Sequence, residues 1–246
     1  MYLVLCYDWD VPGLWAYQKL RNIGLAPIEL VTAARLALAK TWEHRLGHEG
    51  VYLKISLHDG RIFDSSDIRG VLNRLTTVPQ DLISRAVAED REYVSAELSA
   101  FYLSWLSALE RVINRPMPQG LAGSWRHRSE WALLAAKAGL NTPLYRQSST
   151  SRPEDGYGSF ASSDKTVTNV IVLQNELFGS PVSPEIGEAC RKLAASAETD
   201  LLGVELFDSG DGALTFAHAT PFPDLTLGRD ELIEALARTL QMDRDR

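Results

Sequence analysis

The chain has 246 residues, of which 45% are hydrophobic and 23% charged, an ordinary composition for a folded protein of one or two domains. Its formal net charge of -7 disfavours nonspecific binding to nucleic acid or to an anionic membrane, because both require a basic face. No apolar run approaches the roughly 20 residues that span a bilayer, and the N-terminus lacks the basic leader of a signal peptide. The two cysteines, Cys6 and Cys190, make no disulfide framework, so a cytoplasmic location is expected.

The chain begins with the pattern of a parallel β-α-β unit. Tyr2–Tyr7 is a continuous apolar run, typical of a central strand covered on both faces. A helix is predicted over Leu14–Asn22, and Ile28–Val31 is predicted to be the next strand. The turn between them contains Asp8 and Asp10, which could reach a ligand at the carboxyl end of the first strand or could be ordinary solvated turn residues. The glycine pattern of a dinucleotide-binding turn is absent from this turn.

The segment Thr41–His48 places two histidines four residues apart. If the segment is a helix, His44 and His48 lie on one face of it. The zinc-protease motif H-E-x-x-H is different, and no third ligand is evident, so a metal site is not expected here. Val51–Leu57 and Arg61–Phe63 then form a predicted pair of strands, and the short apolar run Val71–Leu75 follows.

The longest periodic segment opens at Pro79 and predicts one helix of about eight turns. Its apolar side chains recur three, four and seven residues apart, at Ile83, Val87, Val94, Leu98, Phe101, Trp105, Leu109 and Val112. The helix should stop before Asn114-Arg115-Pro116, because the residue before a proline avoids helical geometry. A second helix is predicted over Ser129–Ala138, with Ser129 as its N-cap.

The C-terminal half is predicted to alternate strands and helices. A β-branched strand covers Thr166–Leu173, and Ser183-Pro184 begins a helix with a favoured cap and first-turn proline. Two apolar strands, Leu201–Phe207 and Ala213–Ala217, form a hairpin around a turn rich in glycine and aspartate. An amphipathic helix over Arg229–Leu240 ends the chain.

The hairpin carries the most distinctive polar residues. Glu205 lies on its first strand, and His218 and Thr220 come just past its second strand. Pro221-Phe222-Pro223 follows directly and should end the strand pairing, because proline supplies no hydrogen-bond donor to a sheet. These three polar residues are therefore either a working metal and nucleotide site or the remnant of such a site.

Three stretches, taken in order, resemble parts of a known family. The first reads REYVSAELSAFYLSWLSALERVINRP, the second SEWALLAAKAGLNTP, and the third NVIVLQNELFG followed by a helix and LLGVELF…DGALTFAHATPFPDL. They resemble the end of the preATP-grasp domain, the start of the ATP-binding region and the C-terminal half-site of the ATP-grasp superfamily of carboxylate–amine ligases. The resemblance implies an α/β fold with a Rossmann-like preATP-grasp domain over residues 1–118. A truncated ATP-grasp-like α+β domain would cover 119–246, with 147–165 a flexible loop in place of the ATP lid.

In active members of this family, carboxylates and an asparagine on the terminal hairpin hold Mg²⁺ on the phosphates of ATP, since Mg²⁺ prefers oxygen ligands. Matching Pro221-Phe222-Pro223 to the family's p-f-P places His218 at the glutamate position and Thr220 at the asparagine position. Glu205 stands where an aspartate is usual. Because imidazole is a poor ligand for Mg²⁺, the resemblance implies a remnant of a metal and nucleotide site.

The segment between Tyr145 and Thr166 departs further from the family. An active member needs several strands here, which supply a lysine, a glycine-rich lid and a backbone that grips adenine. This chain has RQSSTSRPEDGYGSFASSDK instead. Gly156-Tyr157-Gly158 is a weak phosphate-loop signal, and Lys165 is the one lysine within the stretch. Most of the nucleotide clamp is therefore missing.

These observations predict a degenerate ATP-grasp-like protein that has lost ATP-dependent ligation. It would act as a binding or accessory protein for a small molecule, a peptide or an active ligase, without nucleic acid or membrane as partner, and could form a homodimer. No cofactor is expected, and no catalytic residue is assigned. The candidate cleft residues lie near predicted strand ends and, taken singly, also suit ordinary surface or cap positions: Asp8, Asn73, Arg74, Asn114 and Arg115.

Arg74 is the leading candidate for substrate binding, because a guanidinium at a strand end can hold a carboxylate with two hydrogen bonds. The alternative function is a minimal, active ATP- and Mg-dependent carboxylate–amine ligase that modifies peptides and uses Glu205, His218 and Lys165. A third interpretation sets the resemblance aside and describes a globular α/β interaction protein.

Overall fold

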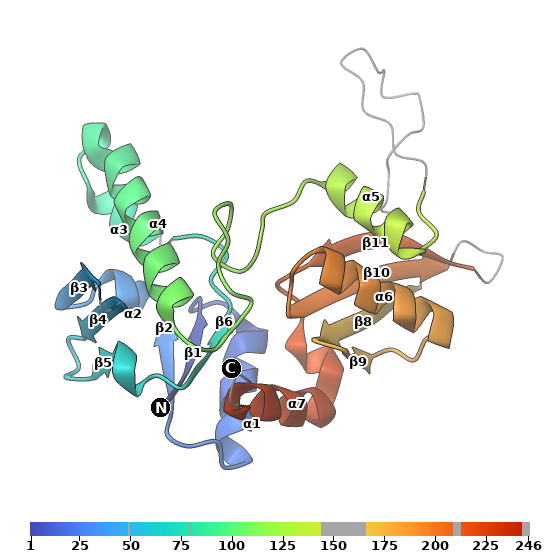
Figure 1. Ribbon diagram of the computed structural model, residues 1–246, viewed down its shortest axis with the longest axis horizontal. Helices are drawn as coiled ribbons and strands as arrows, with labels where there is room; N and C mark the ends of the chain where they lie inside the picture. Colours follow the sequence, from blue (N-terminus) through green and yellow to red (C-terminus); the bar gives the residue numbers. More distant parts are fainter. Residues whose placement is uncertain (49, 79, 144–165, 209–212, 243–246) are drawn as a thin grey trace. The chain divides into compact units, whose positions relative to one another are not determined.

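The computed structural model describes residues 1–48, 50–78, 80–143, 166–208 and 213–242. The chain divides into two compact units: unit 1 comprises Met1–Ser124 and Asp224–Arg246, and unit 2 comprises Trp125–Pro223 (Figure 1). The boundary between a preATP-grasp-like domain (1–118) and an ATP-grasp-like domain (119–246) stays a prediction. Mixed α/β structure is confirmed. Among the described residues, no helix combines the length and apolar character that a membrane span requires.

Unit 1 contains a parallel sheet with the strand order β2-β1-β6-β7. The strands are β1 (Tyr2–Cys6), β2 (Ile28–Thr32), β6 (Gly70–Asn73) and β7 (Val112–Ile113). All five residues of β1 are buried, and β1 pairs in parallel with β2 on one side and β6 on the other. The predicted central strand and β-α-β unit are therefore confirmed. The chain runs from β1 to β2 and then crosses to β6, so the strand order reverses between β1 and β6.

Two helices of unit 1 pack beside each other and contact this sheet. They are α1 (Val11–Asn22), between β1 and β2, and α7 (Arg229–Gln241), which contacts β6 (Figure 1). The side chain of Asp10 caps α1 by accepting a hydrogen bond from the backbone N–H of Gly13 at 3.0 Å. Both helices confirm the predicted segments, with α1 beginning three residues earlier than expected.

An antiparallel meander of three strands lies between β2 and β6 in sequence: β3 (Thr41–Gly47), β4 (Gly50–Ser56) and β5 (Ile62–Asp64). The interpretation of Thr41–His48 as a helix is wrong, because β3 pairs with β4 along its whole length and this pairing satisfies its backbone. His44 and His48 therefore do not share a helix face. The Nε2 atom of His44 lies 3.1 Å from the hydroxyl oxygen of Ser104, a side-chain contact within the fold.

The segment predicted as one long helix forms three pieces. These are α3 (Gln80–Arg85), a 3₁₀ turn (Ala88–Asp90) and α4 (Arg91–Ala108). Val87 is extended, with φ of -59° and ψ of 149°, and its side chain is 62% exposed, so it is not part of the buried stripe. The single-helix prediction is wrong for this reason. The buried face of α4, with Leu98, Tyr102 and Trp105, packs into the unit 1 core together with residues of β1 and β4.

Unit 2 contains an antiparallel sheet with the strand order β11-β10-β8-β9. The strands are β8 (Val167–Leu173), β9 (Glu176–Gly179), β10 (Leu201–Asp208) and β11 (Leu214–Thr220). The predicted strands and the terminal hairpin are confirmed, although His218 and Thr220 lie inside the second strand instead of past it. Part of the predicted hairpin turn, the predicted loop over 147–165, the Gly156-Tyr157-Gly158 motif and Lys165 lie outside the described residues.

Helices α5 (Arg128–Ala138) and α6 (Pro184–Ser196) pack on the same face of this sheet (Figure 1). Ser183 caps α6 as predicted, by accepting from the N–H of Ile186. The predicted N-cap of α5 is wrong, because His127 caps it. The side chain of His127 accepts from the N–H of Ser129, and the carboxylate of Glu130 accepts from the N–H of His127.

Candidate functional site

The terminal hairpin presents a row of polar side chains on one face of the unit 2 sheet. Val204 and Leu206 of β10 are buried in the core beneath α5 and α6, so Glu205 between them points to the opposite face. Glu205 is paired with Asn169 of β8 on one side and with His218 of β11 on the other. We call the surface formed by Asn169, Gly203, Glu205, His218 and Thr220 the Glu205 face.

A β-bulge sets the register of this face. Glu205 is opposite His218, but the next residue of β10, Leu206, is opposite Phe216, so β11 has one extra residue here, Ala217. The bulge brings His218 directly across from Glu205 and leaves Thr220 in the neighbouring row. The structure therefore brings the three predicted remnant residues together on one surface.

The neighbouring row is shaped by the Pro-Phe-Pro segment. Thr220 is opposite Gly203, and its hydroxyl accepts a hydrogen bond from the backbone N–H of Phe222 at 3.1 Å. A Cβ atom added to Gly203 would lie 2.8 Å from the Cβ of Pro223. The glycine therefore allows Pro223 to pack directly against the strand, and the Thr220 hydroxyl holds the turn in place.

The donor set of the Glu205 face does not fit a magnesium nucleotide. Partial burial lowers the pKa of His218, and Arg128 lowers it further, while Glu205 opposes both effects. The imidazole is therefore neutral near neutral pH, and it is a poor ligand for Mg²⁺. Within the described segments, no three histidine, cysteine, aspartate or glutamate side chains are grouped so that they could hold a metal ion.

In unit 1, a buried ion pair occupies the position where open α/β sheets usually bind ligands. Arg74 follows β6 and Asp10 follows β1, the two strands between which the strand order reverses. The Nε atom of Arg74 donates to Oδ2 of Asp10 at 2.6 Å, and Nη2 donates to Oδ1 at 2.9 Å. The two side chains are only 1% and 0% exposed. The guanidinium proposed from sequence as a substrate ligand is thus held by a carboxylate of the same chain.

Asn73 organises the same edge of the sheet. Its side-chain amide donates to the carbonyl oxygens of Asn114 at 3.0 Å and Leu121 at 2.6 Å, and its Oδ1 accepts from the N–H of Leu75 at 3.2 Å. Asn73 and Asn114 are both buried. These bonds join the loop after β6 to the segment after β7, so Asn73 is a structural anchor at a strand end.

The remaining two predicted cleft residues lie in different surroundings. The guanidinium of Arg115 donates to the carbonyl oxygens of Ser107 at 2.8 Å, in the last turn of α4, and of Glu110 at 2.9 Å, just after it. Asp8 is exposed in the loop between β1 and α1. Of the five candidate cleft residues, the structure therefore groups Asn73, Arg74 and Asn114 in the interior of unit 1. It places Arg115 at a helix end and Asp8 on the surface.

A cavity of about 290 Å³ lies beside this edge, between the loop after β6, helix α4 and the turn after β7. We call it the hydroxyl cavity. Its polar lining comes from Thr76, Thr77, Ser95, Ser99 and Gln119, and Val78, Leu103, Pro118, Gly120 and Leu121 complete the wall. No lining residue is charged. The sequence does not indicate this cavity, because Ser95 and Ser99 lie on a helix whose strongest pattern is its apolar stripe. The other lining residues follow β6 and β7, and only the fold brings them next to α4.

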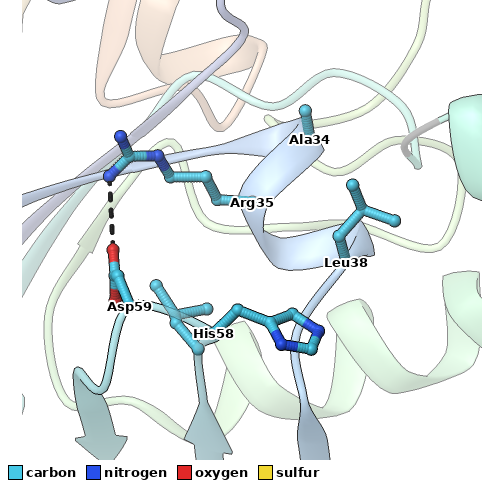
Figure 2. Close-up of a pocket in the computed structure, with 6 residues that line it drawn as sticks. Ala34, Arg35, Leu38, His58 and Asp59 are labelled. Atoms are coloured by element: carbon cyan, nitrogen blue, oxygen red, sulfur yellow. Dashed lines mark ion pairs between the residues drawn. The ribbon is translucent and has the colours of Figure 1, made fainter.

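A second cavity of unit 1, of about 350 Å³, lies beside α2 (Ala33–Ala37). Figure 2 shows its lining, with Ala34, Arg35 and Leu38 on one side and His58 and Asp59 on the other. Arg35 and Asp59 form an ion pair at 3.6 Å. Asp59 also accepts hydrogen bonds from the guanidinium of Arg61, which lowers the pKa of its carboxyl group. The carboxylate of Asp59 is thus paired with guanidinium groups of the same chain, and these charges do not indicate a particular ligand.

Solved structures share this fold across the whole chain. Macrocyclase MdnC from Microcystis aeruginosa MRC, bound with precursor peptide MdnA, matches with a TM-score of 0.71 at 11% identity over 98% of this chain and 99% of that one. A Chryseobacterium gregarium RiPP-associated ATP-grasp ligase, in complex with ADP and a leader and core peptide, matches with a TM-score of 0.71 at 10% identity over 100% and 98%.

The ATP-grasp ligase PsnB, complexed with minimal precursor, Mg and ADP, matches with a TM-score of 0.65 at 14% identity over 98% of both chains. No protein-family model matches the sequence, and no curated protein matches it significantly. At these identities the comparison establishes the fold, and it agrees with the resemblance carried by the three sequence stretches. The chain has the fold of the ATP-grasp superfamily of ligases.

Proposed function

We propose that the protein is an ATP-grasp-like binding protein that has lost ATP-dependent ligation and holds a peptide. The observation that carries the proposal is the pairing on the Glu205 face, where Glu205 lies opposite His218. In the neighbouring row, the hydroxyl of Thr220 already accepts a hydrogen bond from the backbone N–H of Phe222. A magnesium nucleotide needs several oxygen ligands in near-octahedral geometry. One carboxylate beside a neutral imidazole is a weak substitute, so we infer that neither ATP nor Mg²⁺ is a cofactor.

A peptide is the favoured ligand over a free small molecule. The fold is shared with MdnC, which was solved with a precursor peptide, and with the Chryseobacterium ligase, which was solved with a leader and core peptide. Both described thiols, Cys6 and Cys190, are free and buried, which supports work in a reducing compartment such as the cytoplasm. An active ligase or a second copy of this chain as partner is a further prediction, which size-exclusion chromatography with light scattering tests.

Thermal unfolding with and without Mg·ATP tests the loss of ligation. A ligand present at 100 times its Kd stabilises the folded state by about 2.7 kcal/mol, which would raise the Tm of a protein of this size by about 5–10 °C. We expect no shift that depends on magnesium, while PsnB measured in parallel serves as the positive control. A magnesium-dependent shift of that size would overturn the proposal and favour the minimal, active peptide-modifying ligase.

A further inference from the structure

We propose that the hydroxyl cavity of unit 1 binds an uncharged, hydrogen-bonding side chain of a peptide, such as serine, threonine, asparagine or glutamine. The inference rests on the proposed function and adds to it the place and the chemistry of recognition. Parallel α/β sheets bind ligands beyond the carboxyl ends of their strands, and this cavity borders the loop after β6 and the turn after β7. The ion pair of Asp10 and Arg74 closes the more central position on that edge.

The walls of the cavity are fixed before any ligand arrives. The hydroxyl oxygen of Tyr7 accepts hydrogen bonds from the backbone N–H groups of Thr76 at 3.0 Å and Thr77 at 2.9 Å. The opposite wall is a tight turn, closed by reciprocal backbone bonds of 2.9 Å between Met117 and Gly120. The N–H of Leu121 donates to the carbonyl oxygen of Thr76 at 3.3 Å and joins the two walls. A preformed site loses little ordering entropy when it binds.

The lining selects against charged groups. All polar lining side chains are hydroxyls or an amide, and burying a charge without a counter-charge is costly. Phosphate, carboxylate and ammonium groups are therefore disfavoured. The hydroxyl of Ser99 donates to the carbonyl oxygen of Ser95 at 2.7 Å, so its proton is already used and its lone pairs accept. The ligand should thus present an O–H or N–H donor toward Ser99.

The size of the cavity points to one or two residues of a longer ligand. Its volume of about 290 Å³ lies at the lower limit of the roughly 300–1,000 Å³ found for sites that enclose drug-sized molecules. Apolar walls from Val78, Leu103 and Leu121 can contact the methylene or methyl part of the same side chain. A threonine or glutamine side chain, with an apolar stem and a polar end, matches both features.

Titration followed by two-dimensional amide NMR tests the proposal on the full chain. The probes are capped pentapeptides, Gly-Gly-X-Gly-Gly, in which X is glutamine, threonine, glutamate, lysine or leucine. We expect the glutamine and threonine peptides to shift the amide signals of Thr76, Ser99 and Gly120, and the other three to bind at least about tenfold more weakly. Equal binding of the glutamate, lysine or leucine peptides would overturn the proposed chemistry, and stronger binding of a neutral sugar such as maltose would overturn the assignment to a peptide.

Variants on α4 locate the site. Ser99→Leu should abolish binding by filling the cavity, and Ser99→Ala should weaken it about fivefold or more by removing the acceptor without adding volume. Ala100→Leu places the same leucine at the neighbouring exposed position and should leave binding unchanged. If Ser99→Leu fails to fold, the Ser99→Ala variant still decides the question. Peptide binding that survives both Ser99 variants would overturn this site while leaving the proposed binding function standing, and that function fails separately in the Mg·ATP experiment.

Discussion

The two units differ in how deeply the polar residues of their candidate ligand surfaces are buried. In unit 1, the central position at the carboxyl edge of the parallel sheet is occupied by Asp10 and Arg74, which are buried and joined by two hydrogen bonds. In unit 2, the Glu205 face is partly accessible, and Glu205 and His218 meet across a bulge. A buried charge without its partner costs several kcal/mol, whereas a surface side chain can be exchanged for less than about 0.5 kcal/mol. Chemistry can therefore be lost from the Glu205 face while the fold persists.

Removing one partner of the buried pair should give the largest effect. Arg74→Ala should destabilise unit 1 by about 3–5 kcal/mol, because it leaves the carboxylate of Asp10 buried and uncompensated. Urea unfolding gives the free energy. Thiol labelling shows which unit opens, since burial raises the pKa of Cys6 in unit 1 to about 12 and that of Cys190 in unit 2 to about 11. Labelling should increase at Cys6 and not at Cys190.

A double variant provides the control for the buried pair. Asp10→Ser with Arg74→Met removes both charges together and keeps a side chain that can cap α1. We expect it to recover more than half of the stability lost in Arg74→Ala. If Arg74→Ala cost less than about 1 kcal/mol, the pair would not be an essential element of unit 1.

The close approach of Pro223 to the hairpin gives the next largest effect. Gly203→Ala should destabilise unit 2 by about 1–3 kcal/mol, because the added Cβ would lie 2.8 Å from the Cβ of Pro223. Gly47→Ala, also in a strand, is the matched control, since an added Cβ there meets nothing within 4 Å. Chemical denaturation of both variants measures the difference. Equal stabilities would show that the Pro-Phe-Pro segment moves aside freely.

A second carboxylate on the Glu205 face tests whether this surface can hold a cation. His218→Glu places two carboxylates directly opposite each other across the strands, which should destabilise unit 2 by about 0.2–1 kcal/mol at pH 7.5. His218→Gln is the neutral control and should not show this loss. Millimolar MgCl₂ should reverse the loss in the glutamate variant alone, as measured by Tm. No response to magnesium would mean that the face no longer has the geometry of a metal site.

The smallest expected effect is a pH dependence from His218. Its pKa in the folded state is lowered from the ordinary value of 6.5, mainly by partial burial, so the unfolded state binds more protons in this range. The stabilising contribution is therefore complete above pH 6.5 and decreases as the pH falls toward the folded-state pKa. The Tm of the wild type should fall more than that of His218→Gln between pH 7.5 and pH 5. An identical fall in both would show that the imidazole titrates normally.

Sequence patterns predicted the regular elements whose signals are local. The apolar run of β1, the Ser183-Pro184 start of α6 and the glycine-containing hairpin each depend on residues that are close together in the chain. The order of three such stretches was also sufficient for the ATP-grasp resemblance, which the shared fold of MdnC and PsnB supports. Local periodicity carries this information because it reflects which side of each element is buried.

Other features depended on partners distant in sequence. Thr41–Gly47 became a strand because β4 pairs with it, and nothing within the segment excludes a helix. The break at Val87 has no glycine or proline to mark it. The alanine, valine and charged residues around it fit a helix or an extended turn equally well.

The candidate site likewise combines features that depend on local sequence with features that depend on distant partners. Local sequence shows which residue types occupy the terminal hairpin, and the family resemblance implies that His218 stands where a glutamate is usual. Tertiary packing places Arg74 against Asp10, 64 residues away in sequence, and brings Ser99 and Thr76 to the same cavity. The physical reason is that hydrogen bonds and ion pairs depend on distances of about 3 Å between atoms, and such distances are set by how strands and helices pack, not by spacing along the chain.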